Sequence, residues 1–147
     1  MTGGESTDTS VAEALRRAHL ALLEDLRRLE QAARPAPGEG AAALRARLEE
    51  VRPHVAEHFR FEEQNGYMDV VRSRAPHLDR AIGQLAEEHR LLAQSLDALI
   101  AEAGAVGEPG EALRAEVRAW VGRVRRHEAG ENELIQDVFN LDLGAGD

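Results

Sequence analysis

The segment EHFRFEEQNGY (57–67) places a histidine and a glutamate four positions apart, at His58 and Glu62. Far downstream, RRHEAGENEL repeats the arrangement with His127 and Glu131. In an α-helix, residues four positions apart differ by about 40° around the helix axis and by roughly 6 Å along it. The two segments therefore predict helices that each direct an imidazole and a carboxylate to one side.

Four long segments carry the apolar period of amphipathic helices and are separated by stretches rich in glycine and proline. Leu and Ala dominate, and aromatic residues make up only 3% of the chain, which favours helices over strands. Short connections between long helices favour antiparallel neighbours. The sequence therefore predicts an all-α, up-down-up-down antiparallel four-helix bundle. The expected helices span about 11–33, 41–64, 77–103 and 111–139.

Local signals set the expected boundaries of the helices. Ser10 and Glu13 form a capping-box pattern that places the start of the first helix near residue 11. Pro53 lies inside the second segment and is expected to kink or split that helix, because proline lacks the amide and clashes with the preceding turn. The expected organisation is a flexible N-terminus (1–10), the bundle (11–140) and a C-terminal tail (141–147).

Composition excludes several classes of protein. The chain has 147 residues and 16.1 kDa, which suits one domain. Its net charge of −9 argues against nucleic acid as a partner, and the absence of cysteine excludes disulfides and thiolate metal sites. The N-terminus lacks the pattern of a signal peptide, and no apolar run approaches the roughly 20 residues that span a bilayer. We therefore expect a cytoplasmic monomer or weak dimer without a membrane partner.

Histidines also interrupt the apolar faces of the first and third helices. His19 follows Leu15 on the face of the first helix, and His89 follows Leu85 on that of the third. Each half of the chain thus supplies one histidine from its first helix and a His-x-x-x-Glu pair from its second. Antiparallel packing of the helices would bring these side chains to similar positions along the long axis of the bundle. The expected metal ligands are His19, His58, Glu62, His89, His127 and Glu131.

Burying four imidazoles and two carboxylates is costly unless a strong partner compensates for the lost hydration. A pair of cations provides that compensation, and a polar core without metal is the alternative. Imidazole and carboxylate ligands suit iron, manganese, zinc or copper. If Glu62 and Glu131 bridge the ions and an oxide or hydroxide joins them, each ion keeps about one open position. This arrangement favours iron, with zinc and manganese as alternatives.

These residues resemble the signature of the hemerythrin-like (HHE cation-binding) family, in which two helices carry a histidine and two carry His-x-x-x-Glu. The similarity covers residues 11–139 and is to the divergent bacterial type. It implies a carboxylate-bridged di-iron centre, with two non-haem iron ions (Fe2+/Fe3+) and a bridging oxo or hydroxo group. The implied ligands are the same six residues. Mn or Zn is less favoured, and the implied small-molecule partner is O2, peroxide or nitric oxide.

The chain departs from the oxygen-carrying members of that family at two places. Those proteins have a second histidine on the third helix, one turn before the first, where this chain has Leu85. They close the site with His-x4-Asp, whereas here His127 pairs with Glu131 and position 132 is Asn132. Without this histidine, the coordination of the two ions by protein ligands is less saturated. The resemblance therefore points away from reversible O2 transport and toward peroxide or nitric oxide handling, or iron or O2 sensing.

Several residues near the six ligands have two interpretations. His54 lies one turn before His58 and is either a seventh ligand or an exposed histidine. Tyr67 points away if its helix continues, or turns inward as a ligand or proton donor if Asn65-Gly66 ends the helix. His77 precedes the third helix and is expected at the surface.

The small and acidic neighbours of the ligands are also ambiguous. Glu63, Glu88 and Glu128 lie beside ligands but off the predicted inward face, so they are expected to be solvated charges. Alternatively, they accept hydrogen bonds that orient the imidazoles. Ala129 and Gly130 either allow helices to approach closely or leave a path for a small diatomic molecule.

Three functions follow from the sequence. The first is redox chemistry at di-iron, which disposes of peroxide or nitric oxide at open coordination positions. The second is a sensing or storage module in which O2 or iron binding changes the stability of the bundle. The third is a metal-free helical interaction domain in which the histidines are incidental.

Overall fold

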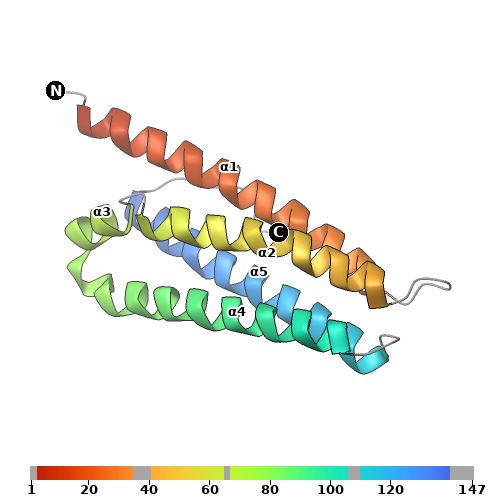
Figure 1. The fold of residues 1–147 in the computed structure, drawn as a ribbon. Helices are drawn as coiled ribbons and strands as arrows, with labels where there is room; N and C mark the ends of the chain where they lie inside the picture. The colour runs from red at the N-terminus through yellow and green to blue at the C-terminus, as the bar shows by residue number, and fades with distance from the viewer. Residues whose placement is uncertain (1–2, 35–40, 65–66, 106–109, 140–147) are drawn as a thin grey trace.

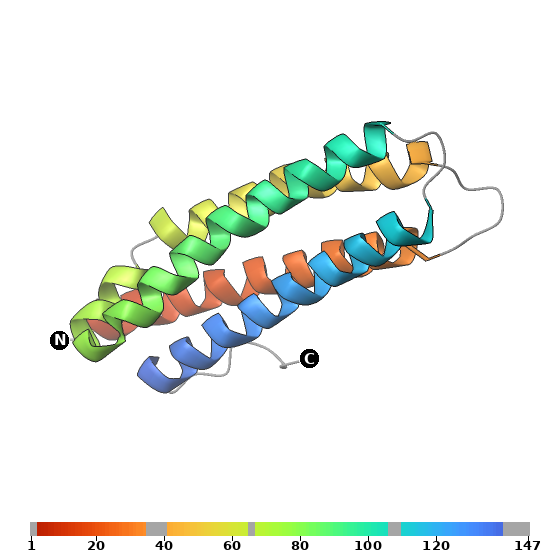
Figure 2. The same cartoon turned by 90° about the horizontal axis from the view of Figure 1, so that it is seen from below.

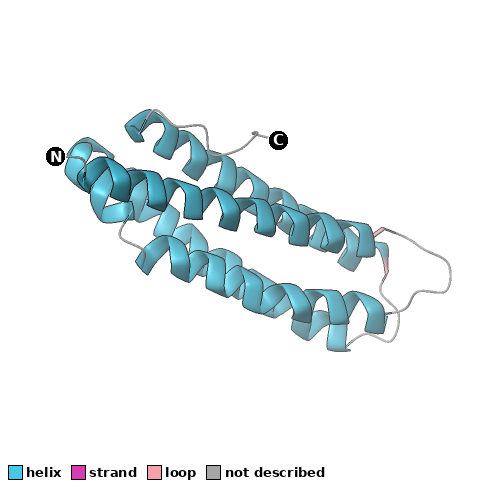
Figure 3. Ribbon diagram, turned by 90° about the horizontal axis from the view of Figure 1, so that it is seen from above, coloured by secondary structure: helices cyan, strands magenta, loops and turns pink. Residues whose placement is uncertain are grey.

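The computed structural model describes residues 3–34, 41–64, 67–105 and 110–139, and for some residues within these ranges only the backbone. The four long helices are α1 (Gly3–Ala32), α2 (Ala41–Gln64), α4 (Asp79–Ala105) and α5 (Glu111–Phe139). A short helix, α3 (Tyr67–Arg74), and a 3-10 turn, η1 (Pro76–Leu78), lie between α2 and α4. The described part of the chain contains no strand (Figure 3). The prediction of an all-helical fold with four long helices is confirmed.

The long helices pack around a shared interior. α1 contacts α2 and α5, and α4 contacts the same two helices. Figure 2 shows the α2–α4 pair as one layer and the α1–α5 pair as the other. α3 and η1 lie at the end of the molecule where α1 begins (Figure 1). None of the described helices is both long and apolar enough to cross a membrane.

The helices differ from the sequence prediction in three ways. α1 begins at Gly3 rather than near residue 11, so Ser10 lies inside the helix; once a helix is nucleated, extending it costs little. α2 runs unbroken through Pro53, which excludes the split, one of the two effects expected of this proline. Pro53 is exposed, and water can bind the carbonyl that the missing amide leaves free. The expected connection over 64–76 contains α3, whose sequence YMDVVRSR has no glycine or proline.

Apolar side chains from all four long helices form one buried cluster. Trp120 is completely buried in it, and its indole Nε1 donates a hydrogen bond to the Leu92 carbonyl at 3.0 Å. Phe59 lies in the same cluster. The apolar period of the sequence also includes Val11 and Val138, whose side chains lie outside the described part. The cluster consists of Leu22, Leu26, Leu29, Ala33, Leu44, Leu48, Val51, Val55, Phe59, Leu92, Leu96, Leu99, Ala103, Leu113, Val117, Trp120, Val121 and Val124.

Two arginines of α5 bind the C-terminal end of α1. Arg114 is buried, and its guanidinium donates to the carbonyls of Ala32 and Arg34 at 3.3 and 2.9 Å. Arg118 donates to the Ala33 carbonyl at 3.0 Å. The last carbonyls of a helix have no partner within the helix, and a charged donor satisfies them strongly. These bonds fix α1 against α5 at the end of the bundle away from α3.

Replacing Arg114 by leucine should therefore lower the free energy of unfolding by about 2 kcal/mol, since it removes a charged donor from buried carbonyls. Urea unfolding followed by circular dichroism measures this change. Arg123→Leu is the matched control, because Arg123 is exposed on the same helix and should change stability by less than about 0.5 kcal/mol. Equal effects of the two substitutions would contradict the assigned role of Arg114.

Candidate metal centre

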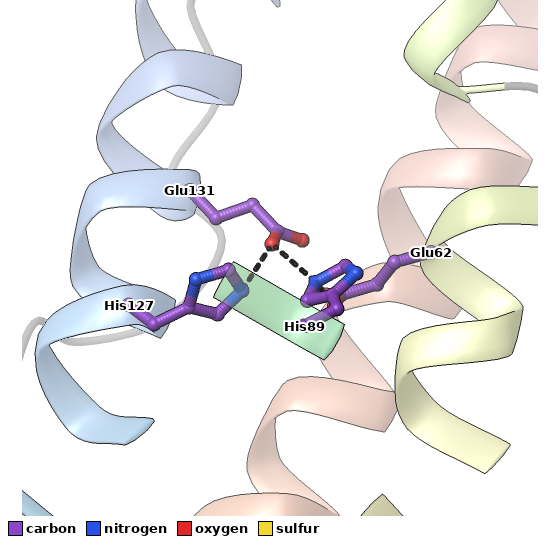
Figure 4. Close-up of side chains that lie close together, drawn as sticks. All are labelled: Glu62, His89, His127 and Glu131. Carbon is purple, nitrogen blue, oxygen red and sulfur yellow. Dashed lines mark ion pairs between the residues drawn. The ribbon is translucent and has the colours of Figure 1, made fainter. Parts of the chain in front are cut away.

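Four buried side chains from three helices meet inside the bundle (Figure 4). Glu62 comes from α2, His89 from α4, and His127 and Glu131 from α5. The Nε2 atom of His89 lies 3.1 Å from Glu62 Oε1 and 3.5 Å from Glu131 Oε2. The Nε2 atom of His127 lies 3.1 Å from Glu131 Oε2. We call these four residues the first donor group.

A second donor group adjoins the first and shares Glu62 with it. It consists of His58, Glu62 and Glu128, all of them buried. His58 Nε2 lies 3.1 Å from Glu62 Oε2 and 2.8 Å from Glu128 Oε1. His19 is partly buried, and its Nδ1 lies 3.0 Å from the same Glu128 oxygen. Glu62 thus directs one carboxylate oxygen to each group.

The separations between donor atoms fit a metal. Donors bound at about 2.1 Å to one first-row ion lie roughly 3.0 Å apart at octahedral angles and roughly 3.4 Å apart at tetrahedral angles. The nitrogen–oxygen distances within the first group, from 3.1 to 3.5 Å, match that range. Buried polar atoms normally have partners, and a cation would supply one. The buried atoms that make no hydrogen bond among the described residues include His89 Nε2, His127 Nε2, Glu62 Oε1 and Glu128 Oε2.

Of the six predicted ligands, five belong directly to these two groups, and His19 joins them through Glu128. The expectation that Glu128 is a solvated charge is wrong, because its residue exposure is only 2%. The sequence contained the clue. Val121 and Val124 lie seven and four positions before Glu128, on nearly the same side of the helix, and both are fully buried. The apolar face of α5 is therefore wide enough to include Glu128.

The outer nitrogens of two imidazoles are held by carboxylates at the surface. His89 donates from Nδ1 to Glu63 at 2.7 Å, and His127 donates from Nδ1 to Glu88 at 2.6 Å. Both glutamates are about half exposed. Such bonds fix the ring orientation and leave Nε2 to face the interior. For Glu63 and Glu88, the interpretation as orienting acceptors is confirmed.

The weaker candidates lie elsewhere. His54 is exposed, and its Nδ1 is 2.9 Å from Asp25 rather than near the donor groups. The structure therefore does not place it as a seventh ligand. His77 is exposed, as expected. The side chain of Tyr67 lies outside the described part of the structure.

Burial and mutual contact shift the pKa values of the cluster in opposite directions. Burial raises the pKa of Glu62 well above its usual range, and the charges of Glu131 and Glu128 raise it further. Burial opposes ionisation of Glu131 as well, yet contacts with Glu62 and the two histidines hold its pKa well below the usual range. Burial alone would lower the pKa of His89, but the carboxylates of Glu131 and Glu62 raise it to about 9. Without a metal, protons thus balance the buried charges.

Comparison with known proteins adds one finding. The family model for the hemerythrin HHE cation binding domain matches residues 10–138. This range includes both donor groups and His19. No curated protein and no solved structure matches the chain.

The stability of the metal-free protein should fall as the pH rises from about 6.5 to 9. The pKa of His89 is raised from 6.5 to about 9 on folding, so its proton stabilises the fold fully below 6.5 and is lost as the pH passes 9. The contribution is on the order of 3 kcal/mol. The pKa of His127 is also raised, which acts in the same direction.

Urea unfolding of the metal-free protein across this pH range measures the change. His89→Gln cannot titrate and should reduce the fall between pH 6.5 and 9. A metal-free wild-type protein that is more stable at pH 9 than at pH 6.5 would contradict the assigned protonation states.

Proposed function

The chain belongs to the hemerythrin HHE cation-binding family, and we propose that it holds two non-haem iron ions and handles peroxide or nitric oxide at them. The observation that carries the proposal is the position of Glu62. Its Oε1 lies 3.1 Å from His89 in the first donor group, and its Oε2 lies 3.1 Å from His58 in the second. A carboxylate with one oxygen toward each of two donor groups suits a bridge between two cations.

The proposed ligands extend the six residues of the sequence prediction by one. The first ion would take Glu62, His89, His127 and Glu131. The second would take Glu62, His58, Glu128 and the adjoining His19. Both positions offer nitrogen and carboxylate oxygen without sulfur, which favours iron over the softer metals and leaves manganese or zinc as alternatives. The proposal includes the up-down-up-down order of the long helices within a domain of residues 11–140.

The protein would orient its ligands and keep bulk water away from them. Glu63 and Glu88 hold the outer nitrogens of His89 and His127, which raises the basicity of the inward nitrogens. The ring of Phe59, which belongs to the apolar cluster, stacks on His89 with centroids 4.2 Å apart and covers one face of this imidazole. Two bound iron ions would supply the redox change and the open coordination positions that peroxide or nitric oxide chemistry requires.

The alternative is an iron- or oxygen-sensing or storage module without turnover. The balance of charges in the metal-free cluster favours it. Burial raises the pKa of Glu62 and so favours its protonated form, whereas contacts with histidines lower the pKa values of Glu131 and Glu128 and favour their ionised forms. A fold that tolerates both protons and cations at one place can gain and lose metal reversibly, as a sensor requires.

Metal analysis tests the ligand assignment. Wild-type protein loaded with ferrous iron and desalted should hold about two ions per chain, whereas Glu128→Gln should hold about one, because it loses a carboxylate of the second position. Glu133→Gln is the control, since Glu133 is exposed on the same helix and should leave two ions bound. Less than half an equivalent of iron in the wild-type protein would overturn the proposal, and an unchanged count in Glu128→Gln would overturn the role of Glu128.

Activity of the iron-loaded protein separates the two functions. We expect catalytic consumption, meaning many turnovers per chain, of hydrogen peroxide, or of nitric oxide when an external reductant is supplied. Glu128→Gln should reduce this rate at least tenfold, on the order of the effect expected for a lost metal partner. Oxygen-electrode and nitric oxide-electrode assays measure it. No turnover, together with a large rise in melting temperature on iron binding, would favour the sensing module instead.

A further inference from the structure

A cavity of about 380 Å³ opens between α4 and α5. His127 lies in its wall, and the side chain of this residue is only 2% exposed. Leu85 and Gly130 also line the cavity. The cavity therefore connects the surface with a residue that belongs to the donor cluster.

The outer part of this cavity carries positive charge. Arg123 and Arg126 line it, both are exposed, and neither makes an ion pair within the described ranges of the chain. The acidic residue in the lining is Glu88, whose carboxylate accepts the hydrogen bond of His127 Nδ1. Two guanidinium groups against one carboxylate leave the path positive, although the whole chain has a net charge of −9.

A second cavity lies on the opposite side of the bundle and has the opposite charge. It lies between α1 and α2, has a volume of about 540 Å³, and includes His58 in its wall. Its acidic lining residues are Glu24, Asp25 and Glu57, and its basic ones are Arg28 and His54. Glu24 pairs with Arg27 and Arg28, and Asp25 pairs with His54, so the three carboxylates still exceed the one guanidinium of the lining. An anion that approaches the cluster is therefore repelled on the α1–α2 side and attracted on the α4–α5 side.

Gly130 is an exposed residue in the wall of the positive cavity. A Cβ atom added at Gly130 would meet nothing within 4 Å. Close approach of another helix therefore does not require a glycine here, which removes one of the two interpretations of this residue. The missing side chain instead leaves space in the wall of the cavity, of which His127 is also a part.

We propose that the α4–α5 cavity admits and binds a small inorganic monoanion, of the size and charge of azide or nitrite, and that Arg123 and Arg126 attract it. This inference rests on the proposed function in that the anion finally reaches the first metal position. The path itself depends on the cavity, the two arginines and the absence of a side chain at Gly130.

Azide binding to the iron-loaded protein tests the charge of the path. In stopped-flow absorbance measurements at low ionic strength, Arg123→Gln/Arg126→Gln should slow azide association roughly threefold or more and weaken its dependence on salt. Association of nitric oxide, which is neutral, should not change. Arg27→Gln/Arg28→Gln alters the net charge equally on the α1 side and should leave azide association at the wild-type rate.

A second pair of variants tests the path by its size. Gly130→Leu fills the α4–α5 cavity and should slow both azide and nitric oxide at least tenfold, whereas Ala18→Leu fills the α1–α2 cavity and should not. Unchanged azide association in the double arginine variant, or a larger effect of Ala18→Leu than of Gly130→Leu, would overturn the inference while leaving di-iron binding intact.

A measurement without metal keeps the inference testable if iron does not bind. Azide titrated into the metal-free protein should shift the amide resonances of Gly130 and His127 in a saturable way, and Arg123→Gln/Arg126→Gln should abolish the saturation. Shifts that are absent, or that are equal in the two proteins, would count against the path. Iron content tests the proposed function, and the azide shifts test the path. Failure of the path can therefore be told from failure of the proposed function.

Discussion

The carboxyl group of Glu62 is the point on which the structure depends. It is almost completely buried, and each of its oxygens faces an imidazole from a different donor group. A buried carboxylate that lies near two other carboxylates cannot stay ionised without positive charge beside it. Protons or cations must therefore occupy the middle of the bundle, and every neighbouring helix supplies residues that accommodate them.

Exchange between protons and cations links stability, pH and metal content. The metal-free cluster is held by charged histidines, since the pKa of His89 is about 9 and that of His127 is also raised. Metal ions must displace these protons, so they bind more weakly as the solution becomes acidic. This competition suits a redox centre, which needs two firmly bound metal ions at neutral pH. It equally suits a sensor, which must release its metal. The number of turnovers, rather than the arrangement of donors, separates these two functions.

Much of the fold and of the site was predictable because the metal ligands lie on the same helical faces as the apolar residues. The period of the long segments located the four long helices, and the His-x-x-x-Glu pairs identified the inward positions. Glu128 was expected in solvent because it lies beside the direction shared by His127 and Glu131, but buried Val121 and Val124 show that the inward face of α5 is wider. The two cavities and their opposite charges could not be predicted, since residues distant in sequence, such as Glu88 and Arg123, form them only after the helices pack.

Anomalous diffraction at the iron edge, from crystals of the iron-loaded protein, tests the central claim most directly. We predict two anomalous peaks inside the bundle, on either side of the Glu62 carboxylate. One should lie among His89, His127 and Glu131, and the other beside His58 and Glu128. A bundle interior without anomalous density, or with iron only at surface carboxylates, would show that protons alone hold these buried residues together.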